Sequence, residues 1–223
     1  MSSVAAPAAL PQRRLRIGRH QGVIVALVVF AVLMSINAFM SNGGLSYFDI
    51  SSLATGGAPL AIAATGQSLV ILTGGFDLSA GAVISLVNAV LATQMQDNPA
   101  SIVTWALLGV GVGMATGAFN GIFIAFLRLQ PIVVTLSTMF IVQGLTLLVM
   151  DKPGGMIPAG LSAALAQDAI PNVLPMALVL LAILMLLWLW LKSTRFGTGI
   201  YAIGSDMEAA RARGINVPWV QFL

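Results

Sequence analysis

The sequence predicts an all-α protein, a polytopic membrane helix bundle of about six transmembrane helices plus a short cytoplasmic helix. Two observations carry this prediction. Of the 223 residues, 58% are hydrophobic and only 8% are charged, whereas about 25% of the residues of a soluble domain are charged. The charged residues also leave charge-free stretches, each long enough, or nearly so, to cross about 30 Å of hydrocarbon as a helix. Lipid must therefore cover most of the surface.

Residues 1–21 are predicted to form a basic cytoplasmic tail. This segment carries four arginines before the first apolar run: Arg13, Arg14, Arg16 and Arg19. A basic segment followed by an apolar run also resembles a targeting peptide, which is the alternative. The run over 22–40 is too long for the core of a typical signal peptide, so we favour an uncleaved first span.

The apolar runs place six spans near 22–40, 52–73, 78–96, 102–127, 131–150 and 174–191. With the N-terminus inside, only Lys152 among the basic residues falls outside. The other nine lie inside: Arg13, Arg14, Arg16, Arg19, Arg128, Lys192, Arg195, Arg211 and Arg213. This excess of positive charge on one side predicts a cytoplasmic N-terminus. Basic residues at the ends of apolar runs also argue against a nucleic-acid partner.

The stretch 72–81 is predicted to interrupt the helices between the second and third spans. Asp77 is the only charged residue between Asp49 and Asp97, and an isolated carboxylate in apolar sequence needs water, a partner or a membrane surface. Its neighbours are small: Gly74, Gly75, Ser79 and Gly81. Asp77 is expected to cap the third span, accepting a hydrogen bond from the amide of Ser79 or Ala80. A role in the transport path or in gating is the second, compatible interpretation.

Small and helix-breaking residues predict how the other spans pack. The fourth span has a stripe of glycines four residues apart, which lets another backbone approach closely. These are Gly109, Gly113, Gly117 and Gly121. Pro59 and several glycines predict that the second span is bent or broken. Pro131 is expected at the first helical position of the fifth span.

Two segments outside the spans also have predicted structure. The loop 151–172 is taken as a linker, or alternatively as a docking surface for an external partner, with a short surface helix over 161–169. In the inside loop 192–217, Ser205 and Glu208 predict a capping box for a helix over 206–213. Gly214 is expected to end that helix in the left-handed conformation. Residues 218–223 look like the opening of a further span, so the chain is expected to be C-terminally truncated.

The composition excludes several kinds of chemistry. There is no cysteine, and His20 is the only histidine, so disulfides, thiolate sites, His-rich metal sites and a Ser-His-Asp relay are not expected. We predict no catalytic residue, no metal ligand and no cofactor bound by this chain. The P-loop pattern is absent as well, so no nucleotide site is expected in this chain.

Two stretches resemble one family, the permeases of bacterial ABC transporters for ribose, xylose, autoinducer and related solutes. Gly75-Phe-Asp-Leu-Ser-Ala-Gly81 is similar to the family's Gly-Ile-Asp-Leu-Ser-Val-Gly signature, with Phe76 in place of isoleucine. Residues 201–217 resemble its cytoplasmic coupling loop, and the similarity extends through nearly the whole chain in order. The matching positions in the loop are Gly204, Glu208, Ala209, Ala210, Gly214, Ile215 and Asn216.

The resemblance implies a subunit of a binding-protein-dependent sugar importer in the bacterial inner membrane. Its partners would be a cytoplasmic ABC ATPase that binds the ATP and Mg²⁺, a second permease subunit, a periplasmic or extracellular sugar-binding protein, and lipid. The two permease subunits are expected to form a homodimer. The ATPase would dock on the 206–213 helix. Four polar residues within the spans would link helices or, alternatively, bind sugar hydroxyls: Gln67, Asn88, Asn120 and Gln143. The alternatives are an ion-coupled secondary transporter, with Asp77 as its one candidate carboxylate, and, more weakly, a membrane enzyme.

Overall fold

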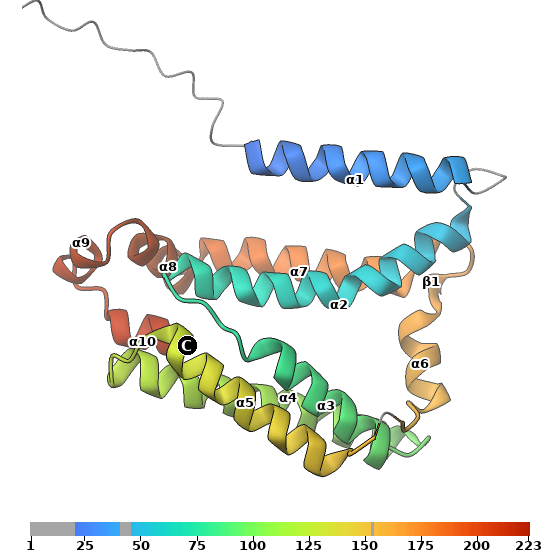
Figure 1. The fold of residues 1–223 in the computed structure, drawn as a ribbon. Helices are drawn as coiled ribbons and strands as arrows, with labels where there is room; N and C mark the ends of the chain where they lie inside the picture. The colour runs from blue at the N-terminus through green and yellow to red at the C-terminus, as the bar shows by residue number, and fades with distance from the viewer. Residues whose placement is uncertain (1–20, 41–45, 153) are drawn as a thin grey trace, which may run out of the picture. The chain divides into compact units, whose positions relative to one another are not determined.

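A computed structural model describes residues 21–40, 46–152 and 154–223 of the chain (Figure 1). Residues 1–20 of the predicted basic tail lie outside the described residues, and Gln21 is the first residue of α1. The chain divides into two compact units, Met1–Asp49 and Ile50–Leu223. The first unit contains α1 (Gln21–Met40), a helix of 20 residues without a buried side chain. A helix that is apolar all round and buries nothing in protein is suited to lipid.

The second unit contains α2 (Tyr47–Leu72, from Ile50 onward), α3, α4 and α5. Figure 1 shows α2 changing direction along its length, as Pro59 predicts, although the helix is not broken. The remaining bounds are α3 (Ala80–Gln94), α4 (Pro99–Gly121) and α5 (Pro131–Val149), which begins with its predicted proline. Side chains of α3, α4 and α5 form one apolar core. Its members are Ala82, Leu86 and Val142, with Val83, Val90, Val112 and Met139 packed against them.

Five of the described helices are long and apolar enough to span a membrane: α1, α2, α4 with its extension to Phe126, α5 and α7. The third predicted span is the exception, because α3 has only 15 residues and is therefore about 22 Å long. Residues 78 and 79 belong to the preceding loop instead. The all-helical membrane bundle is confirmed, with one helix shorter than expected.

The π-helix η2 (Ile122–Phe126) extends α4, and nothing in the sequence analysis anticipated it. After η2 the chain turns at Arg128, whose backbone has the left-handed φ of 58°. Leu129 donates from its backbone N–H to the carbonyl of Phe123 over 3.1 Å. A π-turn holds one more residue than an α-turn, so the last turn of this span is widened.

The glycine stripe of α4 packs within this chain at its two ends. A Cβ at Gly109 would lie 2.9 Å from a methyl group of Val87, and a Cβ at Gly121 would lie 3.2 Å from the carbonyl oxygen of Phe222. The middle glycines, Gly113 and Gly117, have open space there. No other part of the described chain packs closely against Gly113 and Gly117. That another helix approaches them therefore stays a prediction, for a helix of a neighbouring subunit.

The loop between α5 and α7 contains α6 (Ala159–Ala166) and a small antiparallel hairpin. The expected surface helix is present, shifted toward the N-terminus. The hairpin of β1 (Asp168–Ile170) and β2 (Leu174–Pro175) was not predicted; it turns at Asn172, which has a φ of 56°. The backbone N–H of Gly160 donates to the carboxylate of Asp97 over 2.9 Å, which ties the loop to the α3–α4 turn.

After α7 (Met176–Ser193) come three consecutive helices, α8 (Arg195–Ser205), α9 (Met207–Ala212) and α10 (Val217–Phe222). The predicted capping box is wrong: Ser205 is the last residue of α8. Asp206 caps α9 instead, its carboxylate accepting from the N–H of Ala209 over 3.0 Å. The short carboxylate is a good cap, and it leaves the Glu208 side chain free to pair elsewhere. Gly214 has the predicted left-handed φ, 83°.

Candidate functional site

The interruption over 73–79 begins with a glycine-terminated helix end. Gly74, with a φ of 83°, donates to the carbonyl of Ile71 over 3.0 Å, and Gly75 donates to that of Val70 over 3.0 Å. This pair of bonds is a Schellman motif, which uses a left-handed glycine to satisfy the last carbonyls of a helix. The glycines of the signature therefore stop α2 at Leu72 and leave seven residues before α3 begins.

Asp77 binds Ser79, as expected from its position before α3. One of its carboxylate oxygens accepts from the Ser79 N–H over 2.7 Å and from the Ser79 hydroxyl over 2.6 Å. The expected bond from the Ser79 amide is confirmed, but the cap position is held by Ser79 itself, directly before Ala80. The Asp77 carboxylate thus shapes the last turn of the loop and orients a serine that is 1% exposed.

Ser79 connects the loop to two other helices. The Asn120 side-chain amide on α4 donates to the Ser79 hydroxyl over 3.0 Å, and its oxygen accepts from the Thr138 hydroxyl on α5 over 2.6 Å. All three side chains are at most 5% exposed. Hydrogen bonds between membrane helices average about 0.6 kcal/mol and reach about 1.7 kcal/mol. The helix-linking role expected for Asn120 is the one the structure contains.

The loop backbone is held by two further side chains. The Thr135 hydroxyl on α5 accepts from the Leu78 N–H over 3.1 Å and faces the Phe76 carbonyl at 3.2 Å. The Gln67 side-chain amide on α2 faces the backbone of Asp77. In the amide orientation that satisfies both groups, its nitrogen donates to the Asp77 carbonyl over 3.3 Å and its oxygen accepts from the Asp77 N–H over 3.2 Å. We call the set Gln67, Asp77, Ser79, Asn120, Thr135 and Thr138 the interruption network.

The interruption network is a fully paired structural joint. Among the described residues, every buried side-chain nitrogen or oxygen has a hydrogen-bond partner. Lipid tolerates non-helical backbone only where protein or water satisfies its polar groups, and here Gln67 and Thr135 face backbone groups of residues 76–78. Within the same residues no three histidine, cysteine, aspartate or glutamate side chains gather as a metal site would require. The arrangement can fix the positions of the loop and of the helices that contact it.

A cavity of about 820 Å³ opens beside the loop. Its wall includes Thr73, Gly74, Gly75, Phe76 and Asp77 from the interruption, residues of α4 and η2, and residues of α8, α9 and α10. Gly81 is not part of this wall; it lies in the first turn of α3, where its carbonyl accepts from the Ser85 hydroxyl over 3.0 Å. The interruption and the α8–α10 segment therefore share one end of the second unit.

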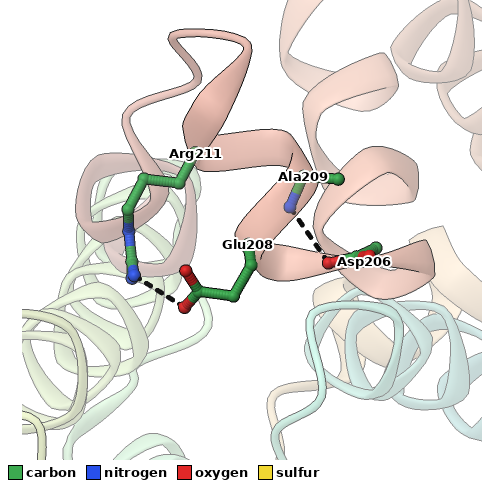
Figure 2. Close-up of polar contacts among 4 residues, drawn as sticks. All are labelled: Asp206, Glu208, Ala209 and Arg211. Carbon is green, nitrogen blue, oxygen red and sulfur yellow. Dashed lines mark hydrogen bonds and ion pairs between the residues drawn. The ribbon is translucent and has the colours of Figure 1, made fainter.

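The sequence-predicted residues on α8 and α9 have different surroundings. Glu208 and Ala209 are exposed, and Glu208 pairs with Arg211 over 2.9 Å, as Figure 2 shows. Ala210 is buried at 3% exposure against Ile203 and Val217. Gly204 belongs to α8 and Gly214 ends α9. Of these residues, only Glu208 and Ala209 have exposed side chains that a partner could contact, together with the exposed Arg211 and Arg213.

The sequence analysis missed two members of the interruption network, Thr135 and Thr138. Both are on α5 three residues apart, so they lie on one face of the helix. A signal was available, because a buried polar face on one span requires a polar partner on another, and Asn120 is such a partner on α4. Which polar residue pairs with the threonines of α5 still depends on how the spans pack, and the packing cannot be read from the sequence of each span.

Comparison with known proteins gives a consistent result. A family described as "Branched-chain amino acid transport system / permease component" matches residues 49–223. A probable ABC transporter permease protein of Sinorhizobium fredii is 35% identical over 89% of this chain and 58% of its own length. The galactose/methyl galactoside import permease protein of Escherichia coli is 33% identical over 85% of this chain and 62% of its own.

A third relative is the galactofuranose transporter permease protein of Escherichia coli, 34% identical over 92% of this chain and 62% of its own length. The chain thus spans about three fifths of the length of these relatives. No solved structure is significantly similar to it. The family match begins after α1 and includes both the interruption network and α9.

Proposed function

Since this chain belongs to the family of branched-chain amino acid transport system permease components, we propose that it forms the membrane-spanning part of an ATP-driven importer. The proposed solute is a sugar of monosaccharide size. The three relatives above are named as permeases, and two of them are named for galactose, methyl galactoside or galactofuranose. The family's own description names branched-chain amino acids instead, which makes such an amino acid the second candidate solute.

The observation that carries the proposal is the position of α9. A helix of six residues is unstable alone in water, yet α9 is held at the end of the bundle by a small apolar cluster. Ala210 packs with Ile203 of α8 and Val217 of α10. The charged side chains of α9, Glu208 and Arg211, have exposed fractions of 81% and 51%, and Arg211 also lines the cavity. A short, anchored helix with exposed charged side chains is suited to binding another protein.

The proposed partner on α9 is a cytoplasmic ATPase that carries the ATP and Mg²⁺. The sequence of this chain has no P-loop pattern, so the nucleotide would be bound by a separate chain. A second permease and an external sugar-binding protein complete the proposed importer. The homodimer and the lipid contacts are part of this proposal, and Gly113 and Gly117 are open positions where a neighbouring helix would fit.

The proposed orientation places the N-terminus and α9 in the cytoplasm. The C-terminal end of α7, together with α8 and α9, lies at one end of the second unit, and β1 and the α3–α4 turn lie at the other (Figure 1). The first end includes Lys192, Arg195 and Arg211, and Arg128 lines the cavity there with residues of α8 and α9. The other end includes Asp97 and Asp168. Positive charge on the cytoplasmic side is the usual arrangement of inner-membrane proteins. The interruption network then lies near the cytoplasmic surface.

The test combines copurification and uptake. The protein is expressed together with a candidate ATPase and a candidate sugar-binding protein, and the ATPase retained on the purified permease is measured. Glu208→Arg with Ala209→Trp should abolish that retention by reversing charge and adding bulk on α9. The matched control is Asp151→Arg with Ala163→Trp, which makes the same two kinds of change at exposed positions of the other end. Full retention by the α9 variant would contradict the docking assignment.

Uptake separates the candidate solutes and the candidate energy sources. Labelled galactose should accumulate in an ATP-dependent manner, and labelled leucine should not. Uptake of leucine alone would establish the second solute. Uptake that survives ATP depletion but collapses with the ion gradient would favour the secondary transporter, in which Asp77 would have to release Ser79 to bind an ion.

A further inference from the structure

The C-terminal ends of α8 and α2 meet at a glycine. Gly204 is the last residue but one of α8, and Leu72 is the last residue of α2. A Cβ atom at position 204 would overlap the carbonyl oxygen of Leu72 and would lie 3.2 Å from its carbonyl carbon. Because a backbone carbonyl cannot swing aside as a flexible side chain can, the approach requires glycine at this position.

A small cleft adjoins the approach between the same helix ends. Leu69 and Leu72 of α2 line this cleft together with Ile200 and Tyr201 of α8. The residue after Leu72 is the first residue of the interruption. Any displacement of Leu72 therefore acts directly on the loop whose backbone Gln67, Asp77 and Thr135 hold in place.

The same end of α8 is joined to α9 by a single residue. Asp206 is both the residue that ends α8, its N–H donating to the Ala202 carbonyl over 3.1 Å, and the cap of α9. Ile203, one residue before Gly204, is packed against Ala210 and Val217 and is 3% exposed. Displacement of α9 must therefore move the end of α8, because a single residue joins them and an apolar cluster clamps them together.

We propose that Gly204 is a positioning residue that passes displacement of α9 to the interruption through the Leu72 carbonyl. The inference rests on the proposed function, because it needs an ATPase that acts on α9. It gives Gly204 a role inside the permease, facing α2, in place of a contact with the ATPase itself. An alanine at 204 would hold α8 away from α2 and would disconnect the two helix ends.

The test uses a thiol in the interruption. The sequence has no cysteine, so Thr73→Cys, at the cavity wall, gives one labelling site in the full chain. The permease is reconstituted with its ATPase, and the rate of maleimide labelling is compared with and without a non-hydrolysable ATP analogue. The expected nucleotide response is a change of about fivefold or more, within the usual range of coupling between sites.

Two glycine variants in the Thr73→Cys background decide the role of Gly204. Gly204→Ala should lose the nucleotide response while the ATPase still copurifies. Gly199→Ala is the matched control in the same helix, since its Cβ would meet the Val220 methyl groups at 3.6 and 3.8 Å, an ordinary contact; its response should equal that of the parent. A parental response in Gly204→Ala overturns the inference.

A further measurement covers the case in which Gly204→Ala does not accumulate in the membrane. The parent thiol at 73 is compared with a thiol at the other end of the unit, Asp151→Cys. A response at 73 but not at 151 supports the inference, and no response at 73 while the ATPase is bound overturns it. Loss of ATPase binding in the parent would overturn the proposed function, and this inference with it, so the two failures are distinguishable.

Discussion

The interruption over 73–79 and the α8–α10 segment end their helices in the same way but are held by different forces. In each, a glycine with a φ of 83° follows the helix, at Gly74 after α2 and at Gly214 after α9. Beyond that turn the interruption is stabilised by a buried hydrogen bond to α4 and a partly buried one to α5. The α8–α10 segment is stabilised by an apolar cluster and by caps within its own sequence.

The difference teaches which region depends on its neighbours. Buried polar contacts in a membrane protein have a defined geometry and cost free energy when one partner is lost. A small apolar cluster with exposed charges outside it tolerates changes on its outer face. The interruption should therefore be sensitive to single polar substitutions, whereas α9 should be insensitive in stability and sensitive only in partner binding. Four substitutions test this contrast, from the largest expected effect to the smallest.

Asp77→Ala should have the largest effect on stability. It removes the acceptor of two hydrogen bonds from Ser79, of 2.7 and 2.6 Å, and bonds to charged groups contribute about 1.5–3 kcal/mol each. We expect a loss of about 3 kcal/mol in the free energy of unfolding, measured by denaturant titration in mixed micelles. Asp97→Ala is the control, because Asp97 accepts one exposed bond from Gly160 and should cost about 1 kcal/mol or less. Equal losses would remove the contrast.

Gly121→Ala tests the seam between the two regions. Its Cβ would lie 3.2 Å from the Phe222 carbonyl oxygen and 3.4 Å from the Phe222 Cα, so α4 and α10 must separate slightly. A loss of about 1–2 kcal/mol is expected from overpacking. Gly113→Ala, with open space around it, should leave the free energy of unfolding unchanged or slightly raised. A destabilised Gly113→Ala with an unaffected Gly121→Ala would contradict the packing described here.

Thr138→Val removes one hydroxyl from the interruption network at nearly constant volume. The hydroxyl donates to Asn120 over 2.6 Å, and its loss should cost about 1 kcal/mol in the free energy of unfolding. Thr146→Val is the matched control on the same helix, because the Thr146 hydroxyl donates only to the carbonyl of Val142, four residues earlier. Such a bond within one helix contributes little, so no measurable loss is expected there.

Glu208→Gln should have the smallest effect. It breaks an exposed ion pair of 2.9 Å with Arg211, and exposed pairs of this kind contribute about 0.5 kcal/mol or less. The melting temperature of the isolated protein should stay unchanged within error, in low salt and in high salt. A loss as large as that of Thr138→Val would show that α9 is part of the structural core and would end the contrast between the two regions.

The sequence predicted the position of the interruption better than it predicted the residues that bind it. Charge-free runs place helices because lipid accepts neither charge nor unpaired backbone, and the glycines around Asp77 mark a helix end through local geometry alone. The partners of Ser79 could not be predicted, since Asn120 is 41 residues away and only packing brings the two together. The cap of α9 was misassigned by one residue because Ser205 and Asp206 are both good caps, and the extent of α8 decides between them.

The extra residue in η2 is taken up by widening one turn of the helix. Each residue of a regular α-helix advances about 100° around the axis, so one residue deleted from the regular turns of α4 would rotate everything after it by about that angle. A π-turn fits one more residue into a single revolution, so deleting one residue from Ile122–Phe126 would return an α-turn and leave Thr135 and Thr138 close to their present orientation. The wide turn thus makes this segment the place where α4 can change its length by one residue and still keep the polar joint.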